Sequence, residues 1–167
     1  IAHAGLDLPD GKVRHNDDIL AALAEKFRPA KVTPFHFEFR GGEFEAAQAI
    51  AIARAQALDL LILDMEKVEG RLGRAADPAE QALLRRCQEH LESLQPLCDL
   101  ALSDTERENL RATGLLSIKP TVLLDEPRPG SDAVARAVLH KAGMMFFYTV
   151  GKTEARAWLV PRHATAE

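Results

Sequence analysis

Apolar and polar residues follow two different periods along this chain, which predicts a mixed α/β protein. Residues 1–6 form a short apolar run that ends in a glycine turn and is typical of a strand. Asp17 or Asp18 is positioned to cap a helix over 19–27, whose apolar residues share one face. Residues 31–39 alternate and place their aromatic side chains on one face, so we predict a second strand there.

The middle of the chain predicts two antiparallel helices. Residues 44–76 contain no proline, and apolar residues at helical spacing continue through 58–72, so we predict one long helix. The stretch "LDLLILD" within it also suits a buried strand, but the helical spacing favours the helix. Asp77-Pro78 makes the turn, because aspartate caps a helix and proline suits its first position. A returning helix over 79–94 completes a helical hairpin.

The last third predicts alternating helices and strands. Ser103 and Glu106 have capping-box spacing and open a short helix. An apolar run over 119–126 ends in acidic residues and is typical of a buried parallel strand. The remaining predicted elements are a helix over 131–141 and two strands over 144–150 and 154–160.

Composition and charge narrow the class of protein. The 167 residues are 47% hydrophobic and 28% charged, which allows one modest core or two small ones. No apolar stretch reaches the roughly 18 residues of a membrane span, so we expect no membrane partner. Cys87 and Cys98 have no metal or CxxC spacing, so we expect idle thiols in a cytoplasmic protein. The negative charge is concentrated in residues 43–110, which contain seven basic and fourteen acidic residues; the net charge of the whole chain is −4. That excess disfavours nucleic-acid binding by the middle segment, whereas residues 111–167 are mildly basic.

The stretch "GLDLPDGKV", residues 5–13, carries the candidate chemistry. A phosphate loop reads G-x-x-x-x-G-K-[ST], and its lysine and hydroxyl contact the phosphates and Mg²⁺. Gly5, Gly11 and Lys12 are the candidate nucleotide-binding residues here. The spacing is one residue too long, and Val13 stands where the Mg²⁺-binding hydroxyl belongs.

Two carboxylates in the same stretch, Asp7 and Asp10, oppose phosphate binding. A like-charge contact near 4 Å costs about 4 kcal/mol at an effective dielectric constant of about 20. The stretch is therefore interpreted as a strand-to-helix turn that holds no phosphate. A cradle for ATP or GTP with Mg²⁺ is the alternative, so no cofactor is assigned.

Four stretches together resemble the YchF/Obg-like family of nucleotide-binding proteins. "TVGKTEARAWLVP" (149–161) resembles the first hairpin of the family's TGS domain, and "LDLLILDMEKVEGRL" (58–72) resembles one arm of its helical hairpin. "LALSDTERENLRATGLLSIKPTVLLDE" (100–126) resembles the segment that returns to the nucleotide-binding domain. "FRPAKVTPFHFEF" (27–39) resembles the stretch ahead of the family's second nucleotide motif.

The resemblance implies an α/β fold with three parts. Residues 1–43 and 115–142 would form a reduced, P-loop NTPase-like domain with a parallel sheet. Residues 44–114 would form an inserted antiparallel helical hairpin, and 143–167 the first hairpin of a β-grasp TGS domain. The resemblance also implies ATP or GTP binding and work near the ribosome.

The chain departs from the family at the chemical motifs. No Asp-x-x-Gly follows the strand over 31–39, so the Mg²⁺-associated carboxylate is missing. The base-reading asparagine is also absent, although Asp125 remains a candidate to accept a base N–H. No histidine or cysteine has metal-ligand spacing, and no catalytic residue is assigned. We therefore expect a degenerate pseudo-NTPase that acts as an interaction protein; an NTP-hydrolysing switch with an atypical phosphate loop is the alternative.

Two surfaces are candidates for partner binding. The TGS end would contact the ribosome or RNA, and the helical hairpin would contact a protein, unless its acidic outer face is simply solvated. The aromatic residues Phe146, Phe147, Tyr148 and Trp158 alternate on strands, which favours a role in the core over a base-stacking platform.

Overall fold

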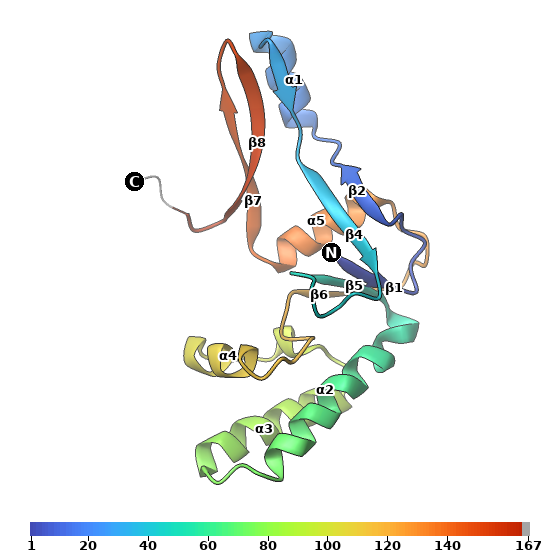
Figure 1. Ribbon diagram of the computed structural model, residues 1–167, viewed down its shortest axis with the longest axis vertical. Helices are drawn as coiled ribbons and strands as arrows, with labels where there is room; N and C mark the ends of the chain where they lie inside the picture. The colour runs from blue at the N-terminus through green and yellow to red at the C-terminus, as the bar shows by residue number, and fades with distance from the viewer. Residues whose placement is uncertain (165–167) are drawn as a thin grey trace.

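The computed structural model describes residues 1–164 and contains two β-sheets (Figure 1). The first sheet has five strands, in the order β2 (Gly11–Arg14), β4 (His36–Gly41), β1 (Ala2–Ala4), β5 (Ile50–Ala53) and β6 (Thr121–Leu124). The second has three strands, in the order β3 (Lys31–Thr33), β8 (Glu154–Pro161) and β7 (Met144–Val150).

Five α-helices and two short 3₁₀ turns connect these strands. The helices are α1 (Asp18–Phe27), α2 (Ala57–Leu72), α3 (Pro78–Glu92), α4 (Asp104–Arg111) and α5 (Ser131–Lys141). The 3₁₀ turns are η1 (Arg54–Gln56) and η2 (Leu97–Asp99). Three helix starts follow the predicted caps: Asp17 caps α1, Asp77 caps α3, and Ser103 with Glu106 forms the capping box of α4.

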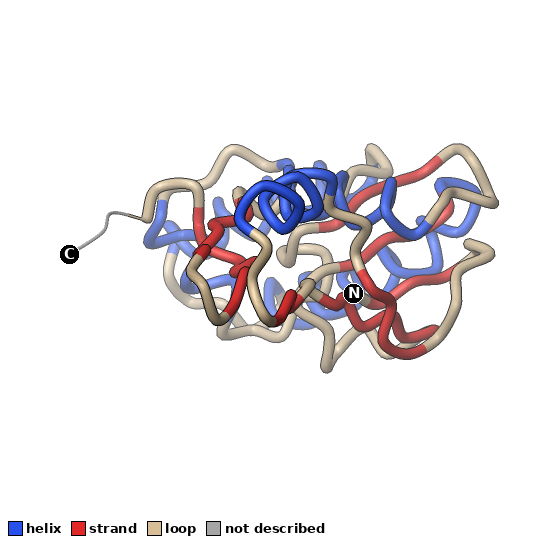
Figure 2. Tube along the Cα trace, turned by 90° about the horizontal axis from the view of Figure 1, so that it is seen from above, coloured by secondary structure: helices blue, strands red, loops and turns tan. Residues whose placement is uncertain are grey.

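The five-stranded sheet is parallel except at one edge. β4, β1, β5 and β6 run parallel, and only β2 pairs antiparallel, with β4. Helices cover both faces, because Ala51 packs in a cluster with Val134 and Ala135 of α5, whereas Ile52 packs with Leu60 of α2. Seen from above, the N-terminus lies among the strands (Figure 2), because β1 is the central strand. The predicted α/β fold with a parallel sheet is confirmed.

The single long helix predicted over 44–76 is wrong at its beginning. Residues 50–53 form β5, whose four side chains are all buried, and α2 begins only at Ala57. In "AIAIA" the alanines favour a helix and the isoleucines favour a strand, so local propensity does not decide between the two. Burial on both faces of a parallel sheet selects the strand instead, and it moves the start of the helical hairpin from 44 to 57.

The strand predicted over 31–39 is in fact two strands in different sheets. Lys31–Thr33 pairs with β8, and His36–Gly41 pairs with β1 and β2. Pro34 lies between them and has no backbone N–H to donate to either ladder. The predicted aromatic face is confirmed, because Phe37 and Phe39 are buried in the core.

The helical hairpin is confirmed and has its own core. α2 and α3 pack through a cluster that includes Leu61, Val68, Leu84, Cys87 and Leu91. Strands and the hairpin occupy different ends of the molecule, so the chain is elongated, with α2 and α3 at the bottom of Figure 1.

The C-terminal hairpin gains a third strand from early in the chain. β3 pairs parallel with β8, and α1 packs against one face of this sheet through Leu20, Ala155 and Ala157. Residues 165–167 of the predicted TGS segment lie outside the described residues. The division into domains and the identity of this sheet as a TGS domain stay predictions.

Candidate functional site

The predicted phosphate loop does not lead into a helix. Gly11 and Lys12 belong to β2, and Lys12 pairs with Glu38 of the antiparallel neighbour β4. The next helix, α1, begins at Asp18. A phosphate loop needs a helix N-terminus directly after the glycine-rich turn, because the first helical N–H groups bind the phosphates. The stretch is therefore a strand-to-strand connection, which corrects the strand-to-helix turn expected from the sequence.

Gly5 has a packing reason to be glycine. Its φ of +67° is in the left-handed region, and a Cβ there would lie 2.6 Å from Oε1 of Gln56 and 2.9 Å from Cβ of Ala53. The turn after β1 thus touches the turn after β5. A glycine at this position requires no bound phosphate to explain it.

Asp10 binds hydrogen-bond donors at the carboxyl ends of β1 and β4. Its Oδ1 accepts a hydrogen bond of 2.7 Å from the backbone N–H of Gly41 and lies 3.2 Å from Nε2 of His3. His3 is buried, with 7% of its surface exposed. Ligands of open α/β sheets bind outside the carboxyl ends of the strands, and here a carboxylate of the chain itself holds two of the polar groups at that edge.

Asp125 is also engaged within the chain. It follows β6 and accepts a hydrogen bond of 2.6 Å from Nε of Arg54, which follows β5. This hydrogen bond and the charge of Asp125 raise the pKa of the Arg54 guanidinium. The two side chains are exposed, so the pair adds little to stability.

The structure does not bring the four predicted nucleotide-binding residues together. Gly5 and Asp125 follow strands separated by β5, whereas Gly11 and Lys12 lie on β2 at the opposite edge of the sheet from β6. Neighbouring strands are about 4.8 Å apart, so Lys12 and Asp125 are on strands separated by about 19 Å. The nucleotide-binding role of these residues stays a prediction.

A polar cluster that sequence patterns could not reveal joins the two sheets. Nδ1 of His15 lies 2.9 Å from Oδ1 of Asp132, and Nδ2 of Asn16 donates to Oδ2 of the same residue at 2.7 Å. The hydroxyl of Tyr148 donates to Oδ2 of Asp17 at 2.8 Å. The His15–Asp132 contact spans 117 residues, so no local spacing signals it.

The environment of this cluster shifts two pKa values. Burial opposes ionisation of Asp132, but hydrogen bonds from His15 and Asn16 outweigh it and lower the pKa of the carboxyl. Burial, together with the neighbouring Asp17 carboxylate, raises the pKa of Tyr148. The His15 ring stacks on Phe146 with a centroid distance of 5.0 Å. These contacts fix the turn before α1 against α5 and β7, which is a structural role.

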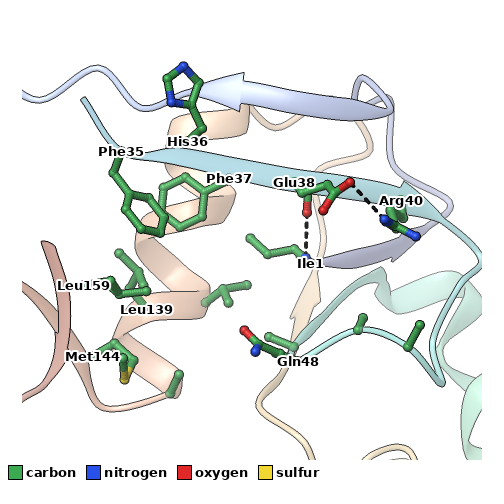
Figure 3. Close-up of a pocket in the computed structure, with 15 residues that line it drawn as sticks. Ile1, Phe35, His36, Phe37, Glu38, Arg40, Gln48, Leu139, Met144 and Leu159 are labelled. Atoms are coloured by element: carbon green, nitrogen blue, oxygen red, sulfur yellow. Dashed lines mark hydrogen bonds and ion pairs between the residues drawn. The ribbon is translucent and has the colours of Figure 1, made fainter. Parts of the chain in front are cut away.

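A cavity of about 660 Å³ lies beside the central sheet and is mostly apolar. Figure 3 shows Phe37, Leu139, Met144 and Leu159 around it, while His36 points away. At its polar side, the Ile1 amine donates to the carbonyl oxygen of Glu38 at 2.7 Å. Most of this lining suits apolar groups, and its two cations are already engaged: Ile1 binds the carbonyl of Glu38, and Arg40 pairs with Glu38 and Glu43.

Metal centres and activated thiols are two further kinds of site that the described residues could hold. Among residues 1–164, no three His, Cys, Asp or Glu side chains are grouped to hold a metal ion. Burial raises the pKa of the Cys87 thiol to about 11, and Cys98 also has a raised pKa, so neither is a reactive thiolate. No helix within this part of the chain is long and apolar enough to cross a membrane.

Comparison with known proteins identifies the fold. No family model matches the chain, and no curated protein matches it. Among 15 matching chains of known structure is the YchF GTPase of Schizosaccharomyces pombe. The two share 16% sequence identity and superpose with a TM-score of 0.71, over 96% of this chain and 73% of that one.

Proposed function

We propose that this chain, which has the fold of the YchF GTPase, is a pseudo-NTPase that acts as a translation- or ribosome-associated interaction protein in the cytoplasm. In this proposal, the helical hairpin contacts a protein and the three-stranded sheet contacts RNA or the ribosome. Similarity of fold does not by itself carry activity, because function depends on the residues of a site.

The observation that carries the proposal is the structure of residues 5–14. The chain runs from β1 into β2 without a helix, and Asp10 occupies donors that face the carboxyl ends of the strands. Asp7 adds a second carboxylate in this connection, only 3.8 Å from Arg128. A triphosphate approaching here meets negative charge and lacks the first-turn N–H groups of a helix.

Turnover tests this proposal. Purified protein incubated with ATP or GTP and Mg²⁺ is expected to release phosphate no faster than buffer does. The proposal would be overturned by Mg²⁺-dependent hydrolysis that copurifies with the protein and is lost when a residue of 5–12, such as Lys12, is replaced by alanine.

One observation favours the alternative, a nucleotide-binding switch with an atypical loop. Gly5 and Gly11 both adopt positive φ values, and Lys12 is exposed with no ion pair among residues 1–164. This alternative requires that Lys12→Ala abolishes nucleotide binding. Lys26→Ala, which removes an exposed lysine of α1, is the matched control. Equal binding by parent and Lys12→Ala would exclude the switch.

A further inference from the structure

The three-stranded sheet has one face that is not covered by residues 1–164. α1 packs on the other face, where Phe146 and Tyr148 join Leu20 in one apolar cluster. On the open face, Phe147 is 53% exposed and Trp158 is 43% exposed. The expectation that both residues belong to the core is therefore wrong. Side chains alternate between faces along a strand, and only every second aromatic residue of β7 is packed.

The register places the two exposed aromatic residues side by side. Phe147 of β7 lies directly opposite Trp158 of β8. The same face carries Met145 on one side of this pair and Thr149 opposite Arg156 on the other. Side chains directly opposite on antiparallel strands have Cβ atoms about 5 Å apart, so both aromatic side chains belong to the same open face.

Local contacts hold Trp158 in place. Its Nε1 donates a hydrogen bond of 3.0 Å to Oγ1 of Thr149, and the guanidinium carbon of Arg156 lies 3.9 Å from the ring centre. The ring is thus ordered before any partner binds, which lowers the entropic cost of stacking on it. The guanidinium plane adds a second surface on which a base can stack.

The charge around this surface is positive although the chain as a whole carries −4. The three strands and the turn between β7 and β8 contribute three cations, Lys31, Lys152 and Arg156, and one carboxylate, Glu154. That carboxylate is already engaged, because Oε1 of Glu154 contacts Thr33 and lies 3.8 Å from Lys31. The surface therefore complements a polyanion.

We infer that this face binds single-stranded RNA, with bases stacked on Phe147 and Trp158 and phosphates near Arg156 and Lys152. The inference rests on the proposed role as a translation-associated interaction protein and names the surface and the chemistry. Two exposed aromatic side chains on one face, beside cations, fit the two parts of a nucleotide, its base and its phosphate. A protein partner or an anionic membrane would use the same apolar area without requiring the ring pair.

Trp158 provides the test, because it is the only tryptophan in the chain. We expect a 12-nucleotide oligouridylate or oligoadenylate RNA to quench its fluorescence on titration into the full chain. Phe147→Ala should weaken binding by about fivefold or more, since loss of one stacking contact costs about 1–3 kcal/mol. Phe27→Ala is the matched control, because Phe27 is also 53% exposed but lies on α1, and it should bind like the parent.

The salt dependence tests the phosphate contacts. Arg156→Gln should reduce the slope of log K against log salt by about 0.7, the value for one phosphate contact on a single strand. Absence of quenching by RNA would overturn the inference. Equal affinity for an RNA duplex, combined with no effect of Phe147→Ala, would overturn it too, and so would a Trp158 response to anionic lipid vesicles but not to RNA. The RNA titration contains no nucleoside triphosphate. A negative RNA titration would therefore leave the pseudo-NTPase proposal standing, and a finding of ATP hydrolysis would not change the RNA result.

Discussion

At the scale of the residue, Gly5 shows how one motif position has two explanations. A glycine that opens a phosphate loop and a glycine that lets two turns touch look alike in a sequence. The structure supplies the second reason, because the missing Cβ makes room for Gln56 and Ala53. The sequence therefore predicts that a turn lies at Gly5, but the reason for the glycine depends on η1, more than forty residues away.

Gly5→Ala should destabilise the protein by about 2 kcal/mol, because alanine is strained at positive φ and its methyl group would overlap Gln56. Gly70→Ala is the control of opposite sign. Gly70 lies within α2, and a methyl group added there would meet open space, so alanine should stabilise by about 0.5–1 kcal/mol. Urea denaturation of both variants measures the two effects. An unchanged midpoint for Gly5→Ala would show that the two turns do not pack as described.

The same scale explains why the polar contacts of the site escaped sequence reasoning. His3 with Asp10 is separated by seven residues, but His15 with Asp132 is separated by 117. A separation of seven would suit one face of a helix, but Gly5 and Pro9 between His3 and Asp10 argue against a helix there. A separation of 117 residues gives no local signal. Tertiary packing brings these side chains together: β4 beside β1 for His3 and Asp10, and the N-terminus of α5 beside the turn before α1 for His15 and Asp132.

At the scale of the element, helices with caps were predictable and buried strands were less so. Asp77 caps α3 where predicted, and the capping box at Ser103 is present with both hydrogen bonds. The helix over 131–141 has the predicted bounds, although no side chain caps its beginning. β5 was missed because its alanines suit a helix and its burial depends on the neighbours β1 and β6. Local patterns thus specify elements whose signals are local, whereas a fully buried strand is specified by the sheet.

One buried carboxylate connects the helical hairpin to the sheet. Asp64 of α2 has no exposed surface, and its two oxygens accept hydrogen bonds of 2.6 and 2.7 Å from the backbone N–H groups of Leu116 and Ser117. These residues precede β6. A buried N–H group without a partner costs about 1–3 kcal/mol.

Asp64→Ala should therefore destabilise the protein by about 3 kcal/mol, because two buried N–H groups lose their acceptors. Asp64→Asn keeps one oxygen acceptor and should cost less. Glu66→Ala, on the exposed side of α2, is the control and should change stability by no more than about 0.5 kcal/mol. Thermal denaturation compares the three variants. Equal stability of Asp64→Ala and Glu66→Ala would contradict the anchoring role.

Tyr148 connects β7 to the cap of α1, and its pKa predicts a pH effect. Burial first, and the Asp17 carboxylate second, raise the pKa of the phenol in the folded state above its value of about 10 in the unfolded chain. The stabilisation is therefore fully present below about pH 10 and decreases as the pH rises further. Tyr148→Phe should cost about 1 kcal/mol at about pH 8, through loss of the hydrogen bond, and should lose less additional stability above about pH 10.

Denaturation of parent and Tyr148→Phe at about pH 8 and above about pH 10 measures the cost of the lost hydrogen bond and the change in pH dependence. Cys87 also has a raised pKa, so the variant should retain part of the loss at high pH. An identical pH dependence in parent and Tyr148→Phe would show that the phenol does not contribute.

At the scale of the whole molecule, the fold and the chemistry of the site separate. The chain superposes on a YchF GTPase over 96% of its length at 16% sequence identity, so the packing of sheets and helices is kept with different residues. Of the predicted nucleotide-binding residues, Lys12 is on an edge strand and Asp125 binds Arg54. Asp10, which opposes phosphate binding, binds the backbone N–H of Gly41. The resemblance in the sequence predicts the fold. That Gly11 and Lys12 belong to a strand, not to a phosphate loop, is visible only from the pairing of β2 with β4.

Calorimetric titration of ATP and then GTP into the purified protein, with Mg²⁺ present, shows whether residues 5–14 can bind a nucleotide. If the protein is a pseudo-NTPase, neither nucleotide gives a heat of binding up to about 1 mM. Any binding free energy is then weaker than about −4 kcal/mol. Saturable binding at about 1 μM, about −8 kcal/mol, would contradict this expectation. Residues 5–14 would then hold phosphates in a conformation different from the connection between β1 and β2 described above.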